Sequence, residues 1–437
     1  MVKITFIGAG STVFSKKVLG DCLLTDELDG LDIALYDIDE ELLKESCAVV
    51  SAINRTYQKG AAIRAYLGPE QRRQALDGAD FVINAVNIGG YPCAVTDFEI
   101  PKKYGLRQTV ADTVGIGGIF RGLRTIPAVM EFVKDMEAVC PDAWLLNYTN
   151  PMAILTGAIQ RAGSIKCVGL CHSVQNVART LMDSVGMSDR FDETVQCETA
   201  GINHQAWLLS ISKNGIDLYP EIKQRLADGI ITNEQNMVRL EILKTFGYYV
   251  TESSPHHAEY HPYFIKATKP DLIERFNIPL DRYLSKYITK SNEWKAQRKA
   301  LVNDPNLEHT RSYEYASHII EAMVTNKPFK LGGNVLNKGL ITNLPGNACV
   351  EVPCIADASG IRPLVVGDLP EQLAAINRTN INPQLLTIEA ALTKKKESIF
   401  HAALLDPHTS AELTIDEIIA LCNELIEAHG DWLPAYH

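Results

Sequence analysis

The sequence lacks the features that mark secreted, membrane-spanning or disulfide-stapled proteins. Its ten cysteines include no Cys-x-x-Cys pair, and no leader-like segment precedes the first apolar stretch. No apolar run reaches the roughly 18 residues that a membrane helix needs. We therefore expect free thiols, no membrane partner and a reducing, cytoplasmic location.

An excess of basic residues is also missing. Lys and Arg number 42 against 53 Asp and Glu, which gives a formal net charge of -11. A nucleic-acid partner needs a basic face for its phosphates, so we expect none. The chain has 437 residues, of which 46% are hydrophobic, enough for the large cores of two closely packed domains.

Strand and helix signals alternate over the first 170 or so residues. A long helix is expected over Ile119–Val139, and the apolar runs are too short for helices and are expected to be strands. These strands cover Ile4–Ile7, Asp32–Tyr36, Phe81–Val86, Trp144–Tyr148 and Val168–Leu170. Nearly continuous apolar strands between helices are typical of a parallel sheet that is covered on both faces. We predict an α/β fold with a Rossmann-like, doubly wound sheet in residues 1–195.

A different pattern follows in residues 196–437. Glu252–His261 is expected to be a polar loop, and Gly332–Asn347 is rich in Gly and Asn. Long helical patterns cover Leu385–Leu404 and Glu412–His429. We predict a second domain of mixed α+β structure.

The first strand is followed by a dinucleotide-binding fingerprint. Gly8-Ala9-Gly10-Ser11 can turn tightly, approach a pyrophosphate and present the N-terminus of the next helix. Asp37 ends the second strand, where an acid can bind the ribose 2′-OH and favour NAD over NADP. Val13 occupies the position of the third glycine, so the fingerprint is incomplete. The predicted ligand is NAD.

Polar motifs follow the later strands, at the edge of the sheet where ligands bind in such folds. They are Asn147-Tyr148-Thr149-Asn150-Pro151, Cys171-His172-Ser173-Val174 and, farther on, Gly201-Ile202-Asn203-His204. Thiolate and imidazole suit a borderline transition metal, so Cys171 and His204 could share an ion. Spacing alone also allows a buried Cys and a hydrogen-bonded His.

Over essentially its whole length the chain resembles the NAD- and manganese-dependent glycoside hydrolases of family 4. The resemblance includes the motifs above, Asp112 with its flanking residues, Gly115–Gly118, Asn343–Pro345, Val350–Val352 and Asp406–His408. Cys171-His172-Ser173-Val174, together with segments at 251–254, 257–260 and 429–434, is similar to the bacterial α-galactosidase (melibiase) branch.

The resemblance implies a role for several residues. Cys171 and His204 would hold Mn²⁺, and Asn150 would contact the sugar. His172 occupies a position where related enzymes carry an Asp general acid, so the sequence departs there. The general base would be Tyr260, with Ser254, His256 and Asp112 as alternatives.

For the cofactor, the expected contacts are Gly8, Gly10, Ser11, Asp37 and Asn147. The implied activity is hydrolysis of α-galactosides such as melibiose by oxidation, elimination, addition and reduction, with NAD regenerated each turnover. The second domain would bind substrate and form a homodimer or homotetramer. Alternative activities are those of a family 4 α-galacturonidase or α-glucosidase and, more distantly, of a lactate/malate-type dehydrogenase.

Some of these residues also have plain structural interpretations. Asp112 could be a helix N-cap before the glycine-rich stretch, and Asn147 and Asn150 could cap the helix that starts near Pro151. His256, His257 and His261 are interpreted as pocket lining or solvated surface rather than as a metal cluster.

Overall fold

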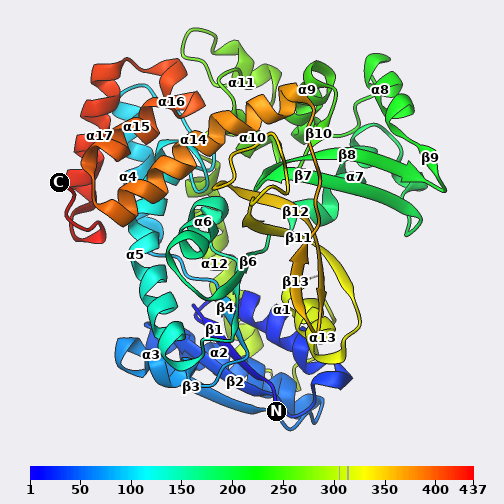
Figure 1. The fold of residues 1–437 in the computed structure, drawn as a ribbon, viewed down its shortest axis with the longest axis vertical. Helices are drawn as coiled ribbons and strands as arrows, with labels where there is room; N and C mark the ends of the chain where they lie inside the picture. The colour runs from blue at the N-terminus through cyan, green and yellow to red at the C-terminus, as the bar shows by residue number, and fades with distance from the viewer. Residues whose placement is uncertain (305, 313) are drawn as a thin grey trace.

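The computed structural model describes residues 1–304, 306–312 and 314–437. Strands and helices alternate through its first part, as the sequence predicts (Figure 1). The strands are β1 (Lys3–Ile7), β2 (Asp32–Asp37), β3 (Ala62–Leu67), β4 (Phe81–Asn84), β5 (Trp144–Asn147) and β6 (Lys166–Gly169). The helices are α1 (Thr12–Leu23), α2 (Glu40–Thr56), α3 (Gly68–Leu76), α4 (Gly90–Lys103), α5 (Gly115–Val139), α6 (Met152–Ala162) and α7 (Ser173–Ser184).

The second part mixes antiparallel strands with helices. Its strands are β7 (Val195–Ile202), β8 (Gln205–Lys213), β9 (Ile216–Asp217), β10 (Tyr249–Val250), β11 (Phe329–Leu336), β12 (Cys349–Asp357) and β13 (Gly360–Pro363). Its helices are α8 (Tyr219–Ala227), α9 (Met237–Phe246), α10 (Ser254–Tyr260), α11 (Asp271–Arg275), α12 (Arg282–Val302), α13 (Tyr315–Thr325), α14 (Glu371–Thr393), α15 (Lys396–Leu404), α16 (Pro407–Glu412) and α17 (Ile415–His429).

The first six strands form the predicted doubly wound parallel sheet. They are ordered β3-β2-β1-β4-β5-β6, and every neighbouring pair is parallel. This is the Rossmann order, in which the chain reverses direction across the sheet between β1 and β4. Ligands bind beyond the carboxyl ends of the strands at that point, so the fold itself indicates where to look for the site.

The sheet continues from the first part of the chain into the second. β11 pairs with β6 through Asn334 and Gly169, and the order then runs β12, β7, β8 and β10. One buried apolar cluster likewise contains Phe6 and Val168 of the parallel strands together with Val350 of β12. The two parts therefore share one sheet and one core.

Three local predictions differ from the structure. The strand β3 was not predicted because it lies at the sheet edge and its side chains are half-buried or exposed, so it lacks the apolar run of a central strand. The helix expected over Leu385–Leu404 is two helices, because Lys394 adopts a left-handed φ of 62° and ends α14.

The third difference concerns Glu252–His261, which contains the buried helix α10 instead of a polar loop. Its Glu259 carboxylate accepts hydrogen bonds from the backbone N–H groups of Thr109, Val110 and Ala111. A distant loop thus satisfies the polar group that burial would otherwise penalise.

The C-terminal helices pack against the first part of the chain. In Figure 1 the red helices α15 to α17 gather beside α4 and α5. Buried His429 bonds Asp97 of α4 at 2.8 Å, and Arg124 of α5 pairs with the same carboxylate at 2.7 Å. No helix among the described residues is long and apolar enough to cross a membrane.

Candidate active site

The dinucleotide loop is shaped by two close backbone approaches. Gly8 has a φ of +86°, and a Cβ there would lie 2.8 Å from the backbone of Ala85, which follows β4. A Cβ on Gly10 would lie 2.9 Å from Oδ2 of Asp37. Only glycine fits these two positions without displacing a neighbour. The loop therefore lies beyond the carboxyl ends of β1 and β4, where nucleotide-binding loops lie in such folds.

Asp37 fixes this loop from the end of β2. Its Oδ2 accepts a hydrogen bond of 2.6 Å from Gly10 N, and its Oδ1 accepts bonds from the N–H groups of Ile38 and Asp39. Ser11 is the exposed N-cap of α1 and lines the pocket described next. The predicted contacts of Asp37 with a ribose and of Ser11 with a phosphate stay predictions.

A pocket of about 450 Å³ lies beyond the carboxyl ends of the parallel strands. The segments that follow β1, β4, β5 and β6 all contribute to its wall, and the second part of the chain closes it. The polar lining residues are Ser11, Asn87, Asp112, Arg121, Tyr148, Thr149, Asn150, Cys171, His172, Ser173, His204, Glu252 and His256. The motifs predicted to carry the chemistry thus meet at one place.

Three potential metal ligands meet in this pocket. One ligand atom from each of Cys171, His204 and Glu252 lies within 4.8 Å of the others. His204 and Glu252 have positive φ values of 64° and 62°, which non-glycine residues rarely adopt. Strained backbone of this kind persists where the surrounding fold enforces it, and it gathers at functional sites.

The electrostatics of this cluster favour a cation. Burial alone would lower the pKa of His204, but the negative charges of Cys171 and Glu252 outweigh it and raise the pKa to about 10. Burial raises the pKa of Glu252, and the nearby His256 and His204 lower it further than burial raises it. Thiolate, imidazole and carboxylate together form a donor set that a borderline divalent ion accepts, so these residues fit Mn²⁺.

His172 stands beside the cluster at the start of α7. Its side chain is 47% exposed, and its Nε2 lies 2.5 Å from Oε2 of Glu314, a carboxylate from the second part of the chain. The ring of Tyr148 lies 6.0 Å away between centroids. A polar, partly exposed imidazole at the pocket wall can transfer a proton to a bound molecule.

Asp112 and His256 form a second polar pair in the pocket. His256 Nε2 lies 3.6 Å from Asp112 Oδ1, and His256 Nδ1 lies 3.3 Å from Glu252 Oε1. Burial would raise the pKa of Asp112, but His256 and the charge of Arg121 lower it well below its usual value. Asp112 precedes the N-cap Val114 of α5, so it is not the cap of that helix.

The predicted site residues that do not line this pocket are Gly8, Gly10, Asp37, Asn147 and Tyr260, and the last two are fully buried. Asn147 is fully buried, and its amide donates to Thr149 O and Thr156 Oγ1 at 3.2 Å. Tyr260 is fully buried in α10, and its hydroxyl donates to Asn203 O at 3.4 Å. Burial, followed by the charge of Asp112, raises the pKa of Tyr260 well above its usual value. Neither side chain can touch a pocket ligand in this arrangement.

Of the remaining predicted residues, some line the pocket and others are buried. Asn150 lines the pocket, and its backbone carbonyl accepts a bond of 3.3 Å from Arg121 Nε. The N-cap of α6 is Pro151 rather than an asparagine, which removes the capping interpretation for Asn147 and Asn150. Ser254 is buried, and its hydroxyl accepts a bond from Arg239 N. His257 and His261 are buried in and after α10, away from solvent.

Sequence reasoning missed the pocket residues Asn87, Arg121 and Glu252, and also Glu314, which contacts the pocket residue His172. Glu252 belongs to a segment noted only for its resemblance, and Arg121 follows the glycine-rich stretch without any motif of its own. Glu314 is 142 positions from His172, so no local pattern could relate the two. Of these residues, only Glu252 could have been proposed from the sequence, because it is an acidic residue in a polar segment.

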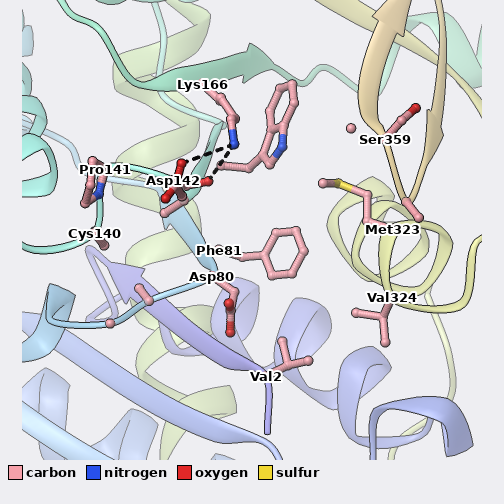
Figure 2. Close-up of a pocket in the computed structure, with 16 residues that line it drawn as sticks. Val2, Asp80, Phe81, Cys140, Pro141, Asp142, Lys166, Met323, Val324 and Ser359 are labelled. Carbon is pink, nitrogen blue, oxygen red and sulfur yellow. Dashed lines mark hydrogen bonds and ion pairs between the residues drawn. The ribbon is translucent and has the colours of Figure 1, made fainter.

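A separate pocket of about 530 Å³ lies at the opposite ends of the strands (Figure 2). Val2, Phe81 and Trp144 line it near the beginnings of β1, β4 and β5, and Lys166 donates to Asp142 O at 3.1 Å. Ligands in doubly wound folds bind at the other end of the sheet, and no potential metal ligands cluster here among the described residues. We assign it no part in the chemistry.

Comparison with known families identifies the architecture. The sequence model of the family 4 glycosyl hydrolases matches residues 3–187, and that of the family's C-terminal domain matches residues 199–409. The chain belongs to family 4 of the glycosyl hydrolases. As a family 4 glycosyl hydrolase it is an enzyme, and the fold predicted from the sequence is confirmed. Membership does not favour the lactate/malate-type dehydrogenase considered as an alternative.

Individual relatives resemble this family 4 enzyme over their full length. An alpha-galactosidase of Bacillus subtilis (strain 168) is 58% identical, with 100% of both chains covered. An alpha-galactosidase of Rhizobium meliloti (strain 1021) is 34% identical, with 99% of this chain and 89% of the relative covered. The structure of a 6-phospho-alpha-glucosidase from gut microorganisms, in complex with NAD and Mn²⁺, has a TM-score of 0.82 at 20% identity, covering 100% of both chains.

Proposed function

We propose that this family 4 glycosyl hydrolase is an α-galactosidase that requires NAD and Mn²⁺. The observation that carries the proposal is that the cluster Cys171–His204–Glu252 shares one pocket with the start of α1. A metal-ligand cluster beside a dinucleotide loop fits a hydrolase that uses redox chemistry. The 58% identity to an alpha-galactosidase over the whole chain supports the choice of sugar.

Residues of both parts of the chain would hold the cofactors. Gly8, Gly10 and Ser11 would face the pyrophosphate of NAD, with Asp37 at its ribose, and Cys171, His204 and Glu252 would hold Mn²⁺. When bound, NAD⁺ supplies a reversible hydride acceptor for C3 of the sugar, and Mn²⁺ supplies a Lewis acid for its oxygens. The ketone that results makes the C2 proton removable and the C1–O bond breakable without a nucleophilic carboxylate.

The chain's own residues then move protons. His172 would protonate the departing oxygen, since its imidazole lies at the pocket wall and an imidazole can act as a general acid. The C2 proton would be taken by the Asp112–His256 pair, whose members line the pocket, whereas Tyr260 and Ser254 are buried. Asn150 and Arg121 would contact the hydroxyl groups of the galactose ring.

We also propose a reducing, cytoplasmic environment and a homodimer or homotetramer. All ten cysteines are unpaired, and Cys171 can act as a ligand only while it remains a reduced thiolate. The oligomeric part is checked by light scattering after size exclusion, where a mass near 48.3 kDa would contradict it.

The proposal is tested by release of p-nitrophenol from p-nitrophenyl α-galactoside with and without each cofactor. Activity should require both NAD⁺ and Mn²⁺, and no net NADH should accumulate because the nucleotide is regenerated. Full activity after exhaustive removal of NAD⁺ would contradict the redox route. A preference for the matching α-galacturonide or α-glucoside in the same assay would replace galactose as the substrate.

A further inference from the structure

Glu314 is a buried carboxylate that contacts an imidazole of the pocket wall. Its side chain is 6% exposed, and Oε2 lies 2.5 Å from Nε2 of His172 on the pocket wall. A carboxylate removed from water is costly unless a partner compensates its charge. The imidazole of His172 is the partner that the structure places against it.

The carboxylate is not needed by its own helix. Glu314 is the N-cap residue of α13, but its side chain makes no capping hydrogen bond. The hydroxyl of Tyr148 instead accepts the bond from Ala316 N in the first turn, at 2.9 Å. The carboxylate of this N-cap residue contacts His172 and does not cap α13. We therefore interpret it as a partner of His172.

The loop that presents Glu314 is fastened to the cofactor-side helix α1. Buried Asp21 of α1 accepts hydrogen bonds from the backbone N–H and the hydroxyl of Ser312, and from Nε2 of His309 at 2.7 Å. The Ser312 hydroxyl in turn accepts a bond from Glu314 N at 3.3 Å. The backbone at Glu314 is thus tied to α1, the helix that follows the dinucleotide loop.

We propose that Glu314 is a positioning residue that holds the imidazole of His172 by its Nε2, so that Nδ1 is the ring nitrogen left to deliver a proton to the leaving group. The proposal rests on the proposed function, in which His172 is the proton donor. It assigns to the second part of the chain a contribution to acid catalysis that the sequence alone does not reveal.

The proton for the leaving group would come from one of the two ring nitrogens of His172. With Nε2–H held by Glu314, the Nδ1–H of the imidazolium is the proton that can be given up. As the C1–O bond breaks, the departing oxygen takes the Nδ1 proton, and the electron pair left at C2 after proton removal forms the C1–C2 double bond. His172 is left neutral, with its remaining proton still bonded to Glu314.

The test compares two leaving groups in Glu314→Gln, with enzyme in excess so that only the first turnover is observed. Release of glucose from melibiose should slow by about 10- to 100-fold, a part of the roughly 10²–10⁴ that general acid catalysis supplies. Release of p-nitrophenol from p-nitrophenyl α-galactoside should change by less than about threefold, because p-nitrophenolate departs without protonation.

Two further variants serve as controls for Glu314→Gln. Glu321→Gln removes a carboxylate of the same helix that pairs with Arg311, away from the pocket, and should leave both rates unchanged. Glu314→Asp keeps the charge and should show a smaller difference between the two substrates than Glu314→Gln, which matters if the Gln variant folds poorly.

Different results would contradict the role of Glu314 and the proposed α-galactosidase function. Equal losses on both substrates in Glu314→Gln and Glu314→Asp, or no loss on either, would overturn the role of Glu314 while α-galactosidase activity of the unaltered enzyme stands. Absence of NAD- and Mn²⁺-dependent activity in the unaltered enzyme would instead overturn the proposed function.

Discussion

At the scale of single residues, the site depends on groups that are unfavourable without a ligand. His204 is 4% exposed, and its Nδ1 has no hydrogen-bond partner in the described part of the chain. Its left-handed backbone adds strain, and the negative charges of Cys171 and Glu252 raise its pKa to about 10. A bound cation would offset the negative charges of this cluster.

Cys171→Ser should therefore weaken Mn²⁺ binding by more than about 100-fold, and Glu252→Gln by about tenfold, because each removes an anionic ligand. Affinity for NAD⁺ should stay within about twofold, since Gly8, Gly10 and Ser11 are untouched. The electron paramagnetic resonance signal of free Mn²⁺ gives the first quantity, and calorimetry gives the second. Cys197→Ser, a half-buried thiol outside the pocket, is the control. Unchanged Mn²⁺ binding in Cys171→Ser would refute the metal assignment.

A second residue-scale prediction concerns the base. Asp112→Asn and His256→Gln should each slow loss of a C2 deuteron from the galactoside by at least about 100-fold, as removal of a general base does. Tyr260→Phe should slow it by less than about threefold, because its hydroxyl is buried and donates to the Asn203 carbonyl. Nuclear magnetic resonance of the recovered sugar measures the exchange. The reverse order of effects would restore Tyr260 as the base.

At the scale of elements, the turn from β1 into α1 determines where a dinucleotide can lie. Its backbone is fixed at both sides, by Tyr36 O, which accepts from Gly8 N at 3.0 Å, and by Asp37, which accepts from Gly10 N. The glycines allow these contacts, so Val13 in place of a third glycine does not prevent the turn from forming.

Gly10→Ala should weaken NAD⁺ binding by about 10- to 100-fold. The new Cβ would lie 2.9 Å from Asp37 Oδ2, and a clash of this kind costs about 1–3 kcal/mol. Gly346→Ala is the matched control, because a Cβ there meets nothing within 4 Å. Titration by intrinsic fluorescence measures both affinities. Equal affinities in the two variants would show that the loop does not form the nucleotide site.

At the scale of the whole molecule, the continuous sheet makes the pocket a joint product of both parts of the chain. His204 follows β7 and Glu252 follows β10, and both reach the edge of the parallel sheet where Cys171 follows β6. Neither part holds the full set of potential ligands, so the site exists only when the chain has folded as a unit.

The buried imidazoles beside the pocket make the stability of this fold depend on pH. Burial lowers the pKa of His261 to about 3 from its ordinary 6.5. Below pH 6.5 the unfolded chain binds a proton there that the folded chain does not, so stability is lost as the pH falls from 6.5 toward 3. From about pH 7 to pH 5 this one group should remove about 2 kcal/mol.

His261→Gln should accordingly lose less stability than the unaltered protein over that interval, although it is less stable at neutral pH. Chemical unfolding followed by circular dichroism at the two pH values measures the difference. His401→Gln, at an exposed position on α15, should behave like the unaltered protein. An identical pH dependence in all three proteins would contradict a neutral, buried His261.

The sequence by itself determined the parallel sheet and the dinucleotide turn, and it predicted Cys171 and His204 as metal ligands. The strands are short apolar runs buried on both faces, and the glycines and the Asp37 acid are local requirements of one turn, so both are readable along the chain. The two ligands were found through the resemblance to family 4, because spacing alone left their pairing open.

Only the tertiary structure decided which polar side chains face the pocket. Nothing local distinguishes Tyr260, which is buried in the helix α10, from Glu252, which lies beside Cys171 and His204. Glu314 meets His172 across 142 positions because β11 pairs with β6 and α13 packs on α1. Contacts of that range depend on how the sheet continues from one part of the chain into the other, and no local sequence pattern encodes it.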